Sequence, residues 1–306
     1  MKSPITIRNH ISLAGLFVLF AVAFVWLSVI NPGDRPVLAE TKLSDLQAVV
    51  LILAVVIPYI AIWAVGLIGY IHLGEYVKLI KKTEEGRPLR MVAGGIFGVL
   101  VSLPISSLIT SGAQVLGKQH ANQALQLRRV GTYLGIVILL WAFYLLMQGS
   151  RKMVESMGRP IRPLPRVAVV SYVLLVGLYI YFVLTNPLFE NGPVNGHLPP
   201  WIVIDTIVLP RLLAWYWGIV AAWHLYQYAH MVPGRIYRLA FSYLAVGVGV
   251  VTLSIILLQY VQAISVVTML PLGAIVLLVY FILIIISAGF MLLARGGREL
   301  AKIEKV

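Results

Sequence analysis

An arginine and an aspartate interrupt an otherwise apolar stretch in the second half of the chain. Arg211 lies about ten residues into a predicted membrane span that starts near Trp201, which at 1.5 Å per residue is roughly 15 Å deep and close to the bilayer midplane. A charged side chain at that depth is costly and usually marks a partner or a ligand pathway. Asp205 lies six residues earlier on another sector of the helix, so the two charges cannot form a standard i, i+4 pair. The pattern allows two roles for Arg211, a ligand-binding cation or a structural anchor.

Aromatic residues follow Arg211 within two helical turns. Trp215 and Tyr216 lie in this deep part of the span, where rings beside a cation suggest a cavity for an amphiphile or a flat ring. Packing of the rings against lipid or neighbouring helices is the alternative. We therefore expect a ligand site made of Arg211, Asp205, Trp215, Tyr216 and Tyr59, the last being the residue that matches Arg211 in the first half.

Two histidines lie near the ends of matching spans. His72 and Glu75 are three residues apart and share one helix face, a spacing that could bind a metal. The second copy reads His224 and Gln227, so it lacks the acid. Two histidines from opposite halves could also ligate a haem axially. The alternative is a pair of hydrogen-bonded histidines at the membrane interface. No motif requires a cofactor, and haem is the one that these residues could hold.

Motifs of known catalytic chemistry are absent from the sequence. It contains no Gly-x-Ser-x-Gly, no His-Glu-x-x-His and no phosphate-binding glycine loop with a lysine. It also contains no cysteine, which excludes disulfides, thiolate metal sites and cysteine nucleophiles. We identify no catalytic residue and favour a function other than catalysis.

The composition is that of an integral membrane protein. The chain has 306 residues, of which 60% are apolar and only 11% charged, and its mean hydropathy is +0.93. Soluble domains are about 45–50% apolar and about 25% charged. An outer-membrane barrel would show strands of alternating polarity, which this sequence lacks. We therefore expect an all-α membrane protein.

Eight stretches are apolar and long enough to span a bilayer, which takes about 20 residues. They fall into a first unit, 1–160, and a second unit, 161–306. The predicted spans are about 10–31, 47–74, 91–115 and 130–150 in the first unit, and 167–187, 201–229, 237–262 and 269–294 in the second. The loop at 116–130 is rich in Gln, Ala and Leu, so it is expected to extend the fourth span as a helix.

The distribution of positive charge sets the expected orientation. The chain has 24 Lys and Arg against 11 Asp and Glu, a net charge of +13. Most of these cations fall in alternate loops, which become cytoplasmic when both termini are inside. We therefore predict a multi-pass protein of the cytoplasmic (inner or plasma) membrane with cytoplasmic N- and C-termini. The sequence has no polar domain with a basic stripe interleaved with aromatic residues, so we expect no nucleic-acid partner.

The two units share a pattern of rare residues. Five pairs are separated by 152 positions: Pro58 and Pro210, Trp63 and Trp215, Gly66 and Gly218, His72 and His224, Tyr76 and Tyr228. Further along, a four-residue deletion gives an offset of 148, which aligns Gly86 with Gly234 and Ser106 with Ser254. Two four-span units have the same orientation, so we expect a pseudo-two-fold axis along the membrane normal, with a site between the halves.

Arginines flank the spans at the predicted cytoplasmic boundary. Arg87, Arg90, Arg235 and Arg238 are expected to contact anionic lipid headgroups. The leading functional hypothesis is binding or transport of a small anionic or amphiphilic ligand between the two repeats. One alternative is a membrane scaffold or subunit that docks a protein partner, another copy of the chain or an anionic lipid. The second alternative is a haem- or quinone-binding redox protein.

Overall fold

A computed structural model gives the arrangement of most of the chain. It describes residues 44–80, 83, 86–116, 121–185, 208–267 and 272–303, together with isolated positions between 15 and 26. In this part of the chain the structure is α-helical and contains no β-strand. The prediction of an all-α protein is confirmed to that extent.

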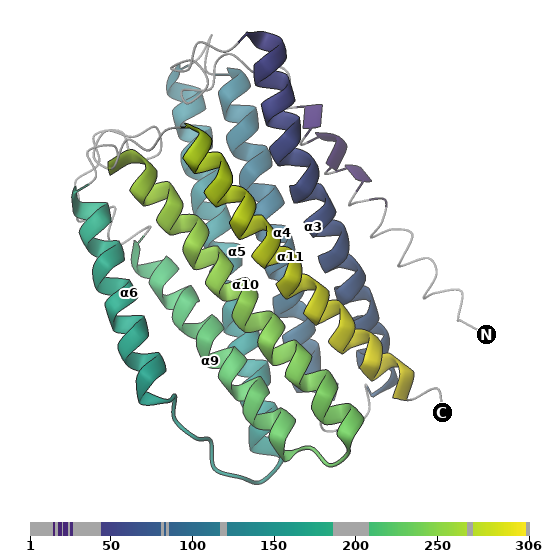
Figure 1. The fold of residues 1–306 in the computed structure, drawn as a ribbon. Helices are drawn as coiled ribbons and strands as arrows, with labels where there is room; N and C mark the ends of the chain where they lie inside the picture. The colour runs from purple at the N-terminus through teal and green to yellow at the C-terminus, as the bar shows by residue number, and fades with distance from the viewer. Residues whose placement is uncertain are drawn as a thin grey trace.

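Seven described helices stand roughly side by side (Figure 1). Each covers one predicted span, from the second to the eighth, while most of the first span lies outside the described residues. The helices are α3 (Asp45–Leu79), α4 (Gly86–Leu116), α5 (Ala121–Ser156), α6 (Arg166–Thr185), α9 (Leu209–Met231), α10 (Arg235–Val267) and α11 (Leu272–Ile303).

Four stretches of the described helices are long and apolar enough to cross a membrane. They are Leu46–Leu79, Gln123–Ser156, Arg235–Val261 and Leu277–Lys302. The outer surface is also apolar: Leu174 on α6 is 69% exposed and Leu277 on α11 is 72% exposed. Long helices with apolar outward faces indicate a membrane protein, because lipid is the solvent that such faces require.

Several helices extend beyond their predicted spans. α3 has 35 residues and begins with a capping box, in which Gln47 N–H donates to the Ser44 hydroxyl while Ser44 N–H donates to the Gln47 side chain. α5 has 36 residues and begins at Ala121, so the predicted helical extension of the fourth span is confirmed. Apolarity locates the membrane-embedded part of a helix, but not the polar turns at its ends.

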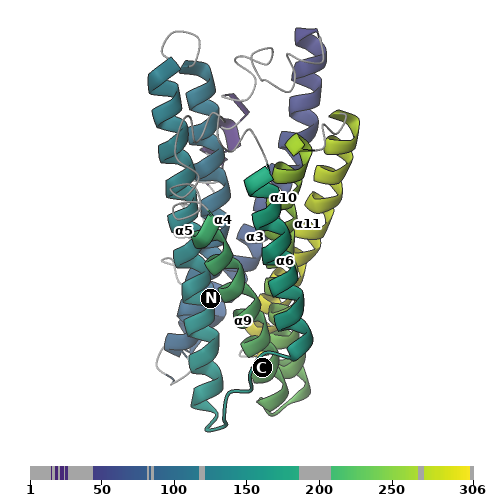
Figure 2. The same cartoon turned by 90° about the vertical axis from the view of Figure 1, so that its left-hand side faces the viewer.

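Six of the helices form a closed ring. Going round it, α3 packs on α4, α4 on α5, α5 on α9, α9 on α10, α10 on α11, and α11 on α3. α6 lies outside this ring and contacts α10 (Figure 2). The main hydrophobic core is shared by helices on all sides of the ring, with Leu73, Phe143, Leu225 and Phe290 almost fully buried.

Candidate functional site

Arg211 belongs to a cluster of aromatic side chains between α6, α9 and α10. Its Nη1 donates a hydrogen bond of 3.2 Å to the phenolic oxygen of Tyr179 on α6. The Tyr179 ring meets the Trp215 ring edge-on with centroids 4.9 Å apart, and lies 5.4 Å from the ring of Tyr260 on α10. Tyr179 and Trp215 are fully buried. We refer to Arg211, Tyr179, Trp215 and Tyr260 as the Arg211 cluster.

Two N–H donors in the Arg211 cluster have no acceptor among the described residues. The Arg211 Nε and the Trp215 Nε1 are both buried and make no hydrogen bond within the described part of the chain. The two residues are four apart on α9, so their side chains share one helix face. A buried donor without a partner costs about 1–3 kcal/mol, and such exceptions call for an explanation. Acceptor oxygens of a ligand would satisfy both donors.

Tyrosine hydroxyls tie the three helices around Arg211 together. Tyr172 on α6 donates a 2.7 Å hydrogen bond to the Leu212 carbonyl on α9, and Tyr260 on α10 donates to the Leu175 carbonyl on α6. These bonds use carbonyls of α6 and α9 as acceptors, so they fix the helices beside the cation. The walls of the Arg211 cluster are thereby set in place independently of any ligand.

Arg211 lies near the start of the described part of α9. That part begins at Leu209, after Val208 in αR backbone geometry, and it carries Pro210 in its first described turn. Arg211 therefore lies in the first turn of the described helix. Trp201 and Asp205 lie outside the described residues, so the predicted contribution of Asp205 stays a prediction.

The other expected ligand residues are distributed unevenly. Tyr216 lies at the edge of the Arg211 cluster, 42% exposed, with its ring 5.7 Å from that of Tyr172. Tyr59 is on α3, where its ring meets Trp63 edge-on at 6.2 Å in a separate apolar cluster. The structure thus places Trp215 in the Arg211 cluster and Tyr216 against Tyr172, whereas Tyr59 belongs to another cluster.

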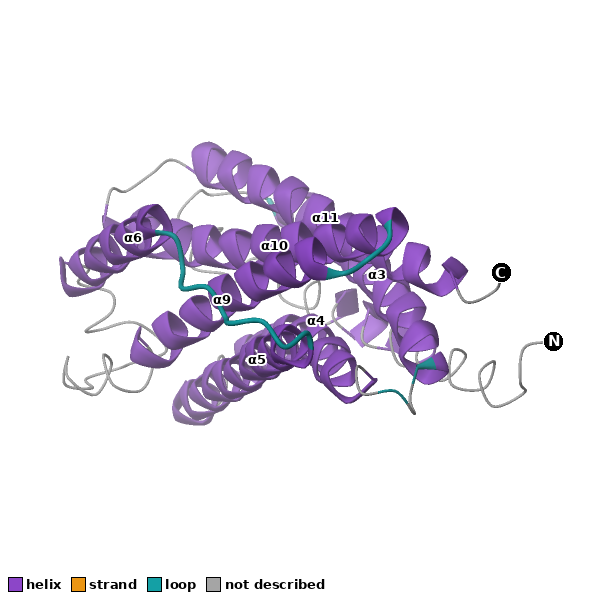
Figure 3. Ribbon diagram, turned by 90° about the horizontal axis from the view of Figure 1, so that it is seen from below, coloured by secondary structure: helices purple, strands orange, loops and turns teal. Residues whose placement is uncertain are grey.

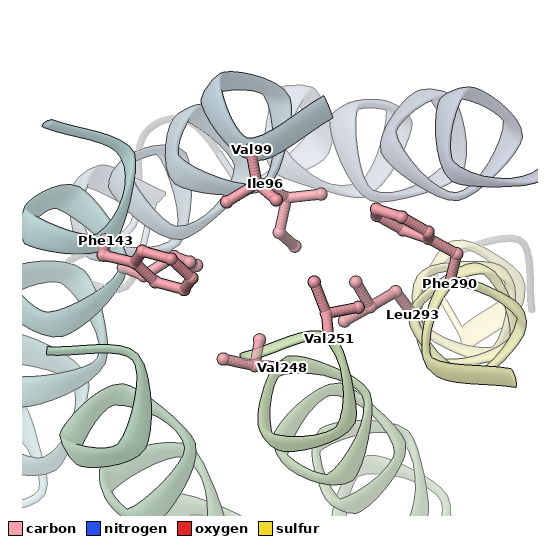
Figure 4. Close-up of a pocket in the computed structure, with 8 residues that line it drawn as sticks. Ile96, Val99, Phe143, Val248, Val251, Phe290 and Leu293 are labelled. Carbon is pink, nitrogen blue, oxygen red and sulfur yellow. The ribbon is translucent and has the colours of Figure 1, made fainter. Parts of the chain in front are cut away.

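A small cavity lies at the centre of the helix ring (Figure 4). Its volume is about 10 Å³, which is roughly the minimum for one water molecule. All of its walls are apolar, so the cavity offers no group that could hold a water or an anion. The lining residues come from α4, α5, α10 and α11: Ile96, Val99, Phe143, Leu146, Val248, Val251, Phe290 and Leu293. Arg211 is not among them.

Comparisons of the chain with protein-family models, curated proteins and solved structures found no match. A role for the Arg211 cluster therefore has to be argued from its own contacts. Two of its members, Tyr179 and Tyr260, were not predicted from the sequence. The available signal for Tyr260 was its position 152 residues after Leu108, where a phenol replaces an aliphatic side chain.

The histidines lie elsewhere in the structure. His72 and Glu75 are near each other on α3, with Nδ1 and Oε2 3.8 Å apart, as their spacing predicted. His224 on α9 is buried, and its Nδ1 makes no hydrogen bond to the described residues. Neither histidine lines the central cavity. Among the residues that the structure describes, no three His, Asp or Glu side chains come together as a metal site.

The arginines predicted to contact headgroups lie at helix starts. Arg87 and Arg90 are in the first turns of α4, and Arg235 and Arg238 are in those of α10. All four are exposed, and Arg90 Nε also donates to the Gly86 carbonyl at 3.3 Å. Their positions are compatible with contacts to lipid, which stay a prediction.

Proposed function

We propose that the protein is an eight-span membrane protein, built from two four-span repeats, that binds a small anionic or amphiphilic ligand at the Arg211 cluster. The observation that carries the binding role is the buried Nε of Arg211. It is a donor on a cationic side chain among aromatic rings, and it has no acceptor in the described part of the chain. Whether binding leads to transport is a further question for the same site.

The lining of the central cavity supports the two-repeat architecture. The α4 residues Ile96 and Val99 are each 152 positions before their partners on α10, while the α5 residues are each 147 positions before theirs on α11. The eight residues thus form four pairs: Ile96 and Val248, Val99 and Val251, Phe143 and Phe290, Leu146 and Leu293. A cavity on a pseudo-two-fold axis would have such a lining.

Close helix contacts support the same architecture. A Cβ at Gly66 would lie 3.0 Å from Phe290, and one at Gly218 would lie 2.8 Å from Phe143. Gly95 and Gly247 form another pair, facing Leu146 and Leu293 respectively. In both pairs the glycine of the first unit is 152 positions before its partner in the second. The pairs of α5 and α11 are 147 positions apart, so the deletion between the repeats has five residues and falls after α4 and α10 rather than before them.

The charges at the helix ends support the predicted orientation. α3, α5, α9 and α11 end where α4, α6 and α10 begin, at one end of the bundle (Figure 1). The cations of these segments include Lys78, Lys152, Arg166, Arg235 and Lys302. A membrane protein normally keeps such an end in the cytoplasm.

The two halves differ at the positions that matter for binding. In the first half, the residues matching Arg211 and Tyr260 are Tyr59 and Leu108, which belong to an apolar cluster around Trp63. The second half therefore carries a cation where the first has a phenol, and a phenol where the first has an aliphatic side chain. A structural duplication does not require such polar specialisation, whereas recognition of an anion does.

This assignment moves the expected ligand site. The sequence placed it between the repeats, but the cavity there is apolar and very small, so it cannot complement an anion. The unsatisfied donors lie instead between α6, α9 and α10, within the second unit. α6 presents an apolar outer face beside them, which would suit the chain of an amphiphile.

Thermal stability of the detergent-purified protein tests the binding proposal. Laurate and dodecyl phosphate should raise the unfolding midpoint more than the uncharged dodecanol does, because only the anions complement Arg211. R211Q should remove this difference and weaken binding of the anions by about 10- to 100-fold, the loss expected for a hydrogen bond to a charged group. R238Q, at an exposed site at the other end of the bundle, is the control. An equal response of R211Q and the unchanged protein would contradict the proposal.

A further inference from the structure

The linker between α5 and α6, residues 157–165, is fastened to α9 at one residue. Arg162 N–H donates to the Gln227 Oε1 at 3.0 Å, and the Gln227 Nε2 donates to the Arg162 carbonyl at 2.8 Å. The Trp223 Nε1 donates to the same carbonyl at 3.0 Å. Figure 3 shows the linker crossing the end of α9 on its way from α5 to α6. Three hydrogen bonds thus fix the backbone of Arg162 and leave its side chain exposed.

The rest of the linker is also restrained. It has no regular secondary structure between residues 159 and 165, and Pro160, Pro163 and Pro165 each have a fixed φ angle. Met157 and Ile161 pack against the hydrophobic core, which holds the segment against the bundle. A restrained segment loses little conformational freedom when it binds a ligand, so it is well suited to present side chains in a fixed pattern.

Two arginines of this segment and a third at the first residue of α6 have no acidic partner among the described residues. Arg159, Arg162 and Arg166 are all exposed. None of them forms an ion pair within the described part of the chain; Glu155, the nearest acid in sequence, pairs with Arg151 at 2.8 Å. These arginines therefore concentrate positive charge at the linker, and no acidic side chain of the described residues balances it.

Neighbouring aromatic residues place this charge at headgroup level. Trp223, which holds the linker, stacks on Tyr226 with ring centroids 5.6 Å apart, and Tyr226 in turn contacts the His230 ring at 4.2 Å. Tryptophan and tyrosine gather where the bilayer meets water. At that depth the anion facing an arginine is the phosphate of a lipid headgroup.

We infer that the linker is a binding site for an anionic phospholipid headgroup, formed by Arg159, Arg162 and Arg166 and held in shape by Gln227 and Trp223. It is distinct from the Arg211 cluster, because Arg211 and Gln227 are 16 residues, or about 24 Å, apart along α9. It is also distinct from the arginines at the starts of α4 and α10. The inference does not depend on the proposed ligand.

Native mass spectrometry of the full-length protein in neutral detergent tests this site. Dioleoylphosphatidylglycerol should be retained in preference to dioleoylphosphatidylcholine. Removing one arginine should lower the affinity for phosphatidylglycerol about fivefold. The triple variant R159Q/R162Q/R166Q should lower it on the order of 100-fold. The control variant K78Q/K152Q/R298Q removes the same charge at the same end, at exposed residues without an assigned headgroup contact, and its affinity for the lipid should fall less than tenfold. Equal losses in the two triple variants would overturn the site in favour of general charge attraction.

A second variant separates the shape of the linker from its charge. Q227L keeps all three arginines but removes two of the hydrogen bonds to Arg162. It should weaken retention of phosphatidylglycerol by about fivefold, comparable to the loss of one headgroup contact. Unchanged retention in Q227L would show that the clamp plays no part. Complete displacement of the lipid by millimolar inorganic phosphate would show that the site takes free phosphate, and would also overturn the lipid assignment.

Discussion

Replacing Gly95 by Ala should destabilise the protein strongly, because α4 and α5 approach each other too closely for a methyl group. A Cβ at Gly95 would lie 2.5 Å from Leu146 Cγ, 2.7 Å from the Ala142 carbonyl oxygen and 2.9 Å from Leu146 N. Two of these atoms belong to the backbone, so the clash cannot be relieved by a change of rotamer. Overpacking of this kind costs about 1–3 kcal/mol, and the helix pair must shift to accept the methyl group.

The adjacent residue provides the control for this prediction. A Cβ at Gly94 would meet only Leu145 Cδ1, at 3.6 Å, which is ordinary van der Waals contact. G94A should therefore leave the unfolding midpoint of the detergent-purified protein unchanged or slightly raised, since Ala is the better helix former by about 1 kcal/mol. A fall in the midpoint that is equal for G94A and G95A would contradict the packing described for α4 and α5.

Replacing either of the paired leucines at the central cavity by alanine should destabilise the protein by a similar amount. Leu146 and Leu293 are 2% and 4% exposed and line the same cavity. L146A and L293A should each lower stability by about 2 kcal/mol, the lower end of the range for buried leucines, because lipid is as apolar as the core and only packing is lost. The unfolding midpoints of the two variants should fall by similar amounts.

The control is a leucine on the outside of the bundle. Leu277 on α11 is 72% exposed, so L277A removes little packing and should leave the midpoint almost unchanged. If L146A were strongly destabilising while L293A matched L277A, the two residues would not be equivalent. The two-repeat architecture would then lose the support of the cavity.

The sequence predicts the fold class well because its strongest signal is apolar length. The absence of charge over more than 20 residues sufficed to locate α3 and α5, and the polar residues before Val130 were recognised as helical. α10 and α11 lie in one charge-free stretch, 239–294, which Pro271 divides. The sequence predicts the total of eight spans and the first residue of each helix less well than it predicts the fold class. The described part of α9 begins at Leu209, so residues 201–207 of that predicted span lie outside the described residues.

The candidate site could be predicted only in part. An arginine in an apolar stretch stands out by its type, and Trp215 follows it at helical spacing. Tyr179 and Tyr260 do not stand out, because a tyrosine that donates across helices has the same sequence signature as one that faces lipid. The apolar nature of the central cavity was also not predictable, since it depends on which faces of α4, α5, α10 and α11 meet.

Photocrosslinking with a diazirine-bearing derivative of laurate tests the central claim most directly. The protein is labelled in detergent, and the modified peptides are mapped. We expect labels on α6, α9 and α10, around Tyr172, Tyr179, Arg211 and Tyr260, and loss of these labels in R211Q. Labelling at the matching first-half positions around Tyr59, to the same extent and unaffected by R211Q, would contradict a ligand site at the Arg211 cluster.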